Sequence, residues 1–302
     1  RRLYASIKFF LYPAVGSLLM LVAIIWMYHL HAEQTGVFTS DLMTITNNID
    51  IPFGPQKWLF AAFFLAFAIK VPMFPFHTWL PHAHVQAPTA ISVVLAGVLL
   101  KMGTYGFLRI AFPIFPAASV YFANCIAWLG LVNIIYGALC AMAQSDVKKL
   151  IAYSSVSHMG FVMLGLAAMS IQGMNGAVLQ MFNHGTSTAM LFLLIGILYE
   201  RSHHRWIIRP DGTKGFGGLY TQLPKYTIIF IIAMFASMGL PGLSGFISEA
   251  LIFLGIFEFN KTITVLALFG LLIGAAYLLW MFKRMFFGEV IEECKAYTDV
   301  NA

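Results

Sequence analysis

Two lysines lie where a charged side chain is costly. Lys70 ends the apolar run that begins at Trp58, and Lys101 follows the apolar run from Ile91 to Leu100. An ionisable group at the centre of a bilayer costs about 2.5–3.5 kcal/mol on insertion scales, and it persists mainly along polar pathways. Desolvation makes an ammonium group release its proton more easily, and a neighbouring carboxylate opposes that effect. These properties suit a proton relay; the alternative is a lysine that extends from a helix end to the headgroups.

Three further ionisable residues fall in apolar segments: His158, His184 and Glu249. Histidine exchanges protons near neutral pH without help, whereas lysine and glutamate must be shifted by burial and neighbours. Each of the five residues belongs to a different predicted span, so a helix bundle would allow them to form a lateral string. A single histidine in an apolar span is more often a hydrogen-bonded core residue, so the relay hypothesis depends on the whole group.

The composition is that of a polytopic membrane protein. Of 302 residues, 60% are hydrophobic and only 10% are charged, and the mean hydropathy is +0.82; soluble domains carry about 25% charged residues. The net charge of +6 is therefore expected to report membrane topology, not nucleic-acid binding. The three cysteines show no metal-site spacing, and no nucleotide-binding or nucleophile motif occurs, so this chain is not expected to hold a cofactor or metal.

Spans of about 20 apolar residues predict an all-α membrane fold with eight transmembrane helices. They are expected at 9–30, 57–76, 89–110, 119–143, 148–168, 175–199, 225–257 and 262–287. With these spans, thirteen lysines and arginines, Arg1 included, fall on one side and three fall on the other. The basic side is the cytoplasmic side, so both termini are expected there.

Two of these spans are predicted to be broken. One carries prolines at positions 72 and 75 just after Lys70, and the other carries the segment Gly239–Gly245 shortly before Glu249. Proline and glycine free backbone groups within a span, which is tolerated where the break lines a cavity. Paired breaks with nearby charges indicate repeats around an ion site at the membrane midplane. The segment that holds His77, His82 and His84 lies between the spans 57–76 and 89–110, and it is expected to be a loop with structural or headgroup contacts.

Four stretches together resemble a known family. They are Ala66–Pro72 (AFAIKVP), Trp79–Thr89 (WLPHAHVQAPT), Leu99–Arg109 (LLKMGTYGFLR) and Leu150–Phe161 (LIAYSSVSHMGF). They resemble the antiporter-like proton-pumping subunits of NADH:quinone oxidoreductase, respiratory complex I. The Gln86–Thr89 segment and the Lys101 context resemble subunit M, the counterpart of mitochondrial chain 4, more than subunits L and N.

The resemblance implies a fold of fourteen helices with two inverted five-helix repeats, of which this chain would be the sixth through the thirteenth helix. Residues 1–110 would be part of the first repeat, 119–288 the second, and 289–302 a cytoplasmic tail, all in one membrane domain. The chain begins at Arg1 without a methionine, and we expect it to be incomplete at this end. In the family, the lysine matching Lys70 pairs with a glutamate of the fifth helix, which would precede Arg1.

The resemblance also implies a function. Quinone reduction elsewhere in the complex would drive a proton relay through Lys70, Lys101, His158, His184 and Glu249. NADH, FMN, iron–sulfur clusters and quinone are expected in other subunits; the expected partners are those membrane subunits, including neighbouring antiporter-like ones, and the lipid bilayer. A multisubunit sodium/proton antiporter and a non-conducting scaffold subunit are the alternatives. The sequences of the motifs that begin at Trp79 and Gln86 favour a bacterial plasma membrane over the mitochondrial inner membrane.

Overall fold

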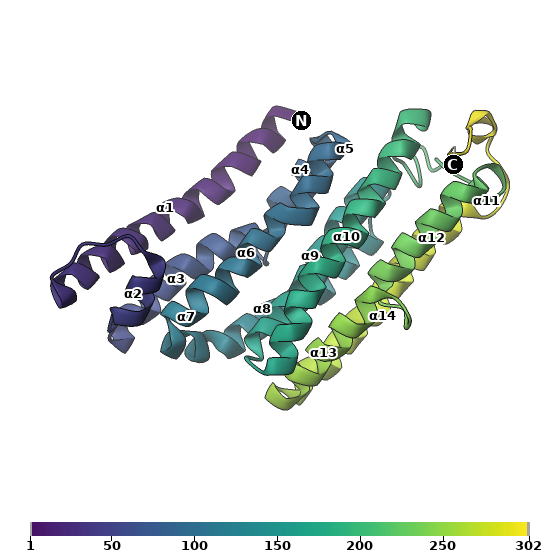
Figure 1. The fold of residues 1–302 in the computed structure, drawn as a ribbon. Helices are drawn as coiled ribbons and strands as arrows, with labels where there is room; N and C mark the ends of the chain where they lie inside the picture. The colour runs from purple at the N-terminus through teal and green to yellow at the C-terminus, as the bar shows by residue number, and fades with distance from the viewer. Residues whose placement is uncertain (1, 301–302) are drawn as a thin grey trace.

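The computed structural model describes residues 2–300, so Arg1 and the last two residues of the predicted tail lie outside the described part. Within this range the chain is a bundle of roughly parallel helices, with both ends of the chain at the same end of the bundle (Figure 1). Six helical segments of the described range are long and apolar enough to cross a membrane. They are α1 (Arg2–Thr35), the run Thr89–Ile114 that contains α5 (Thr89–Val94), α6 (Leu100–Gly106) and α7 (Phe112–Ile114), α8 (Pro116–Met142), α9 (Val147–Ala167), α10 (Ile171–Ser202) and α14 (Lys261–Phe286).

The other two predicted spans are broken helices, as expected. The first consists of α3 (Phe53–Lys70), the 3₁₀ turn η1 (Phe76–Thr78) and α4 (Trp79–Gln86). The second consists of α12 (Pro224–Met238) and α13 (Ser244–Phe259), which continue along one line in Figure 1. With the six continuous helices they account for the eight predicted spans. Both termini lie at the same end of the bundle, which agrees with an even number of spans. The short elements α2 (Leu42–Asn48), α11 (Leu219–Gln222) and η4 (Glu292–Ala296) lie outside these spans.

The expectation of a loop around His77, His82 and His84 is wrong, because this segment is helical. It forms η1 and α4, and it continues the first broken helix beyond the break. The indole Nε1–H of Trp79 donates to the carbonyl of Ile69 at 2.8 Å, which joins the two halves across the break. Trp79 and His84 are fully buried. Packing against the bundle therefore keeps in a helix a segment whose composition indicates a turn.

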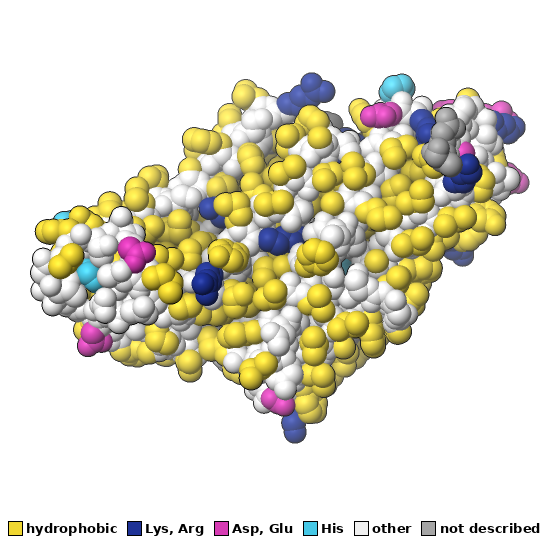
Figure 2. Space-filling view, viewed as in Figure 1, with side chains coloured by type: hydrophobic (Ala, Val, Ile, Leu, Met, Phe, Trp, Pro, Cys, Tyr) yellow, Lys and Arg dark blue, Asp and Glu magenta, His cyan; other side chains and the backbone are white. Residues whose placement is uncertain are grey.

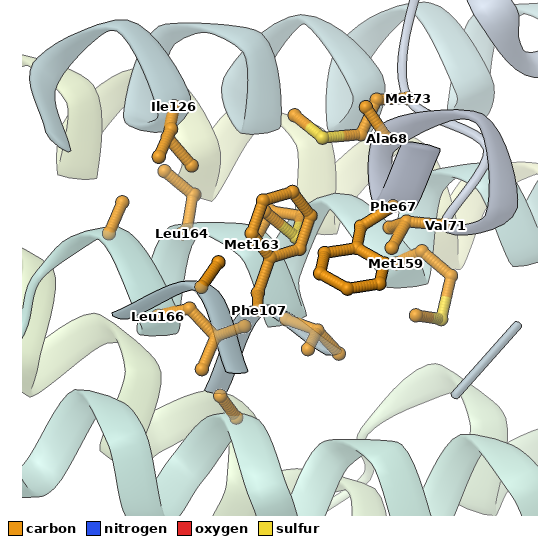
Figure 3. Packing of buried hydrophobic residues seen from close by; sticks show 14 of the residues in the cluster. Phe67, Ala68, Val71, Met73, Phe107, Ile126, Met159, Met163, Leu164 and Leu166 are labelled. Carbon is orange, nitrogen blue, oxygen red and sulfur yellow. The ribbon is translucent and has the colours of Figure 1, made fainter. Parts of the chain in front are cut away.

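Helix α9 forms the centre of the bundle and packs against both α8 and α10. Nearly all of its side chains are buried. Small residues allow the close approach, since a Cβ at Gly137 would lie 2.8 Å from the backbone nitrogen of Ser157. Figure 3 shows the apolar core beside it, where Phe67, Phe107 and Met159 meet. The close packing of α9 against α8 and α10 helps to position the ionisable residues.

The outer surface is apolar over the spans. Figure 2 shows hydrophobic side chains across most of the visible face, while the acidic side chains lie toward its margins. Large side chains such as Leu18, Trp58 and Leu272 are exposed on different helices. Without a nonpolar solvent such a surface would be unfavourable, so it agrees with a bilayer around the bundle.

The predicted tail is docked onto the bundle, where it caps a helix. Helix α12 has no side chain of its own at its N-terminus to accept the first free N–H groups. The carboxylate of Asp299 accepts them instead, from the backbone N–H groups of Lys225 at 2.8 Å and Tyr226 at 3.1 Å. The long loop after α10 joins the same layer, since Arg209 forms an ion pair with Glu293.

Replacing Asp299 with alanine is expected to destabilise the first turn of α12 by about 1 kcal/mol, the usual cost of losing a cap. Backbone amide exchange in residues 225–227 should become roughly fivefold faster at pH 7. Burial would raise the pKa of Asp299, but the hydrogen bonds from Lys225, Val300 and Tyr226 lower it below the ordinary 3.8. A lowered pKa means that the cap is present above that ordinary value and is lost as the pH falls through the lowered one.

The matched control is Asp211→Asn. Asp211 accepts a hydrogen bond from Thr213 within the loop after α10 and does not bond to α12. Its replacement should leave exchange in residues 225–227 unchanged. If Asp299→Ala also leaves this exchange unchanged, the tail does not hold the first turn of α12.

Candidate functional site

The site begins with a direct contact between two predicted residues on different helices. Lys101 on α6 donates from Nζ to the Nδ1 atom of His184 on α10 at 2.6 Å. The same Nζ also donates to the carbonyl of Ala96 at 2.6 Å. The first contact requires an Nδ1 atom without a proton, so the ring of His184 carries its proton on Nε2 when Lys101 is charged. One proton can thus pass directly between a primary amine and an imidazole.

The helix that carries Lys101 is irregular around it. Five residues on either side of α6 form the π-helical segments η2 (Leu95–Leu99) and η3 (Phe107–Ala111). In η2 the N–H of Leu100 reaches back to the carbonyl of Leu95, one residue further than in an α-helix. π-helical turns widen a helix and occur frequently at functional sites. A Cβ at Gly185 would lie 3.3 Å from the carbonyl of Gly97, so glycine lets α10 bring His184 close to Lys101.

The next residue is His158 on α9. Its ring lies 5.6 Å from that of His184, measured between ring centroids. A small cavity of about 10 Å³ borders both rings together with Gln180 and Ser237. This is close to the space that one water needs, and its walls supply polar partners. The Nε2 atom of His184 is buried and has no hydrogen-bond partner among the described residues.

His158 leads on to Glu249 on α13. Its Nδ1 atom lies 3.7 Å from Oε1 of Glu249, within ion-pair distance when the ring is protonated. On the other ring nitrogen, Nε2 lies 3.4 Å from the hydroxyl of Ser237. A second small cavity borders His158 and Glu249 and extends to Tyr277 on α14. His158 therefore borders both cavities, and one of its ring nitrogens faces the carboxylate.

A polar network that the sequence did not predict holds Glu249. The amide of Gln180 donates to Oε1 of Glu249 at 3.4 Å, and the hydroxyl of Ser248 donates to Oε1 of Gln180 at 2.5 Å. Asn183 donates to Ser248 at 3.0 Å and to the carbonyl of Ser244 at 2.7 Å, beside the second break. Gln180 and Asn183 are three residues apart and therefore share one face of α10, the helix that carries His184. This spacing of two amides in an apolar span is the signal from which the sequence could have indicated the network.

Glycine completes the Glu249 site. Gly239 ends α12 with a φ of +73°, a conformation that other residues rarely adopt. A Cβ there would overlap the carboxylate of Glu249. The break thus creates the space into which the carboxylate projects.

Four of the five predicted residues therefore come together in one row: Lys101, His184, His158 and Glu249. Lys70 does not join it. Its side chain is partly exposed at the end of α3, and no hydrogen bond or ion pair to it occurs within residues 2–300. The predicted carboxylate partner of Lys70 would come from a helix before Arg1, so that pairing stays a prediction.

This chain is similar to known membrane proteins. A family described as NADH:quinone oxidoreductase/Mrp antiporter, transmembrane, matches residues 1–274. NADH-quinone oxidoreductase subunit M of Rhodobacter capsulatus is 47% identical over 97% of this chain and 57% of its own length. NADH-ubiquinone oxidoreductase chain 4 of Chondrus crispus is 48% identical over 96% of this chain and 56% of its own length. The chain thus spans little more than half the length of these relatives.

Solved structures show the same fold. A chain of respiratory complex I from Thermus thermophilus superposes with a TM-score of 0.89 at 33% identity, over 99% of this chain and 61% of that one. A chain of the Mrp complex from Dietzia superposes with a TM-score of 0.79 at 20% identity, over 96% of this chain and 52% of that one, which shows the fold alone. The predicted likeness to subunit M and chain 4 is confirmed. The chain belongs to the NADH:quinone oxidoreductase/Mrp antiporter transmembrane family.

Proposed function

We propose that this chain is part of a proton-translocating membrane subunit of an NADH:quinone oxidoreductase. The observation that carries the proposal is the row of ionisable groups from Lys101 through His184 and His158 to Glu249. His184, His158 and Glu249 are buried within the bundle, and Lys101 is partly buried. NADH, FMN, iron–sulfur clusters and quinone would be bound by other subunits, which carry out the redox chemistry. This chain's own residues hold and move protons.

The relay works in steps set by the contacts. When Lys70 carries its charge without a carboxylate partner, its field favours loss of a proton from Lys101. Lys101 passes that proton to Nδ1 of His184, at 2.6 Å. His184 then releases its Nε2 proton into the polar gap toward His158, whose Nδ1 faces Glu249 at 3.7 Å. Glu249 is the last group of the row and passes the proton to the outer side.

The proposed setting follows from the relatives and from the exposed apolar surface. The partners are the other membrane subunits of the complex, including neighbouring antiporter-like subunits, and the lipid bilayer. The proposed location is a bacterial plasma membrane, with the basic end of the bundle in the cytoplasm. In the proposed arrangement, residues 1–110 are part of the first inverted repeat and carry Lys70 and Lys101, and residues 119–288 are the second repeat and carry Glu249. His158 and His184 connect the two halves.

A subunit of a sodium/proton antiporter is the second candidate, because the matching family and the shared fold include Mrp proteins. The identities of 44–48% to relatives named as NADH–quinone or NADH–ubiquinone oxidoreductase subunits favour the first candidate. Sodium-dependent proton exchange in vesicles without NADH would favour the second.

The test uses Lys70→Ala in the full-length subunit within the assembled complex. Inverted membrane vesicles report NADH-driven acidification and NADH oxidation together. We expect acidification per NADH oxidised to fall several-fold, because the charge that drives proton loss from Lys101 is lost. Wild-type values of both rates in an assembled complex would show that Lys70 has no part in coupling.

A further inference from the structure

The break that follows Lys70 is held by one side chain from another helix. Asn133 on α8 accepts at Oδ1 from the backbone N–H of Phe74 at 2.6 Å. Its Nδ2 donates to the backbone carbonyl of Pro72 at 3.1 Å. Asn133 is 0% exposed. A single amide therefore satisfies one donor and one acceptor that the break has freed.

No other side chain within the described range hydrogen-bonds to the backbone between Val71 and Pro75. A buried backbone group without a partner is unfavourable, and water is scarce within a span. The backbone bonds from Met73 to Ala68 and from Phe76 to Met73 turn the chain but leave the carbonyl of Pro72 and the N–H of Phe74 for Asn133. The conformation of the turn after Lys70 thus depends on Asn133.

The same face of α8 covers the break more widely. Tyr136 lies three residues after Asn133, which places both on one helix face. Its ring lies 5.3 Å from that of Phe74 and 5.1 Å from that of His77. Helix α8 therefore contacts the break through a hydrogen-bonding residue and an aromatic one.

Another face of α8 is joined to the helix that carries His158. The carbonyl of Ile134, next to Asn133, accepts from the hydroxyl of Ser157 at 2.9 Å. A Cβ at Gly160 would lie 2.9 Å from the Cβ of Asn133. One helix thus touches both the Lys70 turn and the neighbours of His158, although Lys70 has no direct contact with the row of relay residues.

We propose that Asn133 is a positioning residue for Lys70: it holds the turn after Lys70 from α8, and so sets where Lys70 stands relative to the relay. The inference rests on the proposed function of Lys70 and adds a residue of α8 to it. Asn133 is not a proton carrier, since an amide does not titrate. Its role is to keep the break in one conformation where it packs against α8.

The first measurement tests the two hydrogen bonds of Asn133 directly, by amide exchange and without an activity assay. Asn133→Leu keeps nearly the same volume and removes both bonds. In the purified complex, backbone amide exchange at Phe74 should become at least about tenfold faster, because this N–H loses its acceptor. The control is Ser119→Ala on the same helix, which removes only the bond to the carbonyl of Phe115 and should leave Phe74 unchanged. Unchanged exchange in Asn133→Leu would overturn the proposal.

The second measurement asks whether Asn133 acts through Lys70. Acidification per NADH oxidised is measured for Asn133→Leu, Lys70→Ala and the double variant at equal amounts of assembled complex. We expect each single variant to lose at least threefold and the double variant to lose no more than Lys70→Ala alone. Losses that multiply would mean that Asn133 supports the fold and does not position Lys70.

The outcomes separate the two proposals. If Lys70→Ala pumps normally, the function proposed for Lys70 fails, and the positioning role fails with it. If Lys70→Ala fails to pump but Asn133→Leu pumps normally, only the positioning role fails. Should Asn133→Leu not assemble, Asn133→Ser is measured in the same way, because its hydroxyl retains one of the two bonds. Asn133→Ser alone is expected to lose less pumping than Lys70→Ala. The variant that combines Asn133→Ser with Lys70→Ala is expected to lose no more than Lys70→Ala alone.

Discussion

Replacing Lys101 with methionine in the full-length subunit is expected to stop proton transfer through this subunit, a fall of at least about 100-fold in rate. Methionine fills a similar volume but carries no proton. The row then loses the group that contacts His184 at 2.6 Å, and no other described donor reaches Nδ1 of that ring. Acidification per NADH oxidised in inverted vesicles is the measurement.

A companion variant separates charge from proton transfer. Lys101→Arg keeps the positive charge, but a guanidinium group does not release its proton in proteins. We expect it to fail as completely as methionine. If arginine restored pumping, Lys101 would act as a fixed charge, and the transfer from Lys101 to His184 would be wrong.

The control for both is Lys283→Met. Lys283 lies in the last turn of α14, exposed, and makes no ion pair within the described chain. It changes the net charge equally and should leave pumping at the wild-type value. Equal losses from Lys101→Met and Lys283→Met would point to a general effect of charge or assembly.

Replacing Glu249 with glutamine is expected to have the second-largest effect, on the order of 10-fold or more in acidification per NADH. The change keeps the shape, and its amide oxygen can still accept from Gln180, as Oε1 does now at 3.4 Å. It removes the carboxylate that faces Nδ1 of His158 at 3.7 Å. His158 would then lack the group that receives its proton, and the row would end inside the membrane.

Glu258→Gln is the matched control, because Glu258 lies on the same helix but is exposed near its C-terminal end. It should pump normally. Normal pumping by Glu249→Gln would instead mean that protons leave the row before α13, most directly through the cavity beside Ser237 and Tyr277. The position of the exit is therefore decided by this pair of variants.

Much of the fold could be predicted from the sequence, because the bilayer restricts the choices. Within a span every backbone group must be satisfied locally, so long apolar runs become helices and prolines mark where they break. Both predicted breaks occur, at Val71–Pro75 and at Gly239–Leu243. The loop expected around His77 was wrong because its helix depends on partners distant in sequence, among them Phe192, whose ring stacks on that of His84 at 4.5 Å.

The site could be predicted only in part. A charge inside an apolar run is visible in the sequence, so Lys101, His158, His184 and Glu249 can be predicted from it. Their order and spacing were not visible. The π-helical segments beside Lys101, the approach of Gly97 to Gly185 and the network of Gln180, Asn183 and Ser248 arise from packing between helices.

Hydropathy, charge and proline act locally, so the amino-acid sequence is enough to predict a helical membrane protein with ionisable groups in five spans and breaks in two of them. Which of these groups meet depends on the packing of the helices. Hydrogen bonds act over about 3 Å, and a row of four residues requires four helices to be positioned to that accuracy. Close packing of α8, α9 and α10 supplies this accuracy, and it also brings Asn133 to the turn after Lys70.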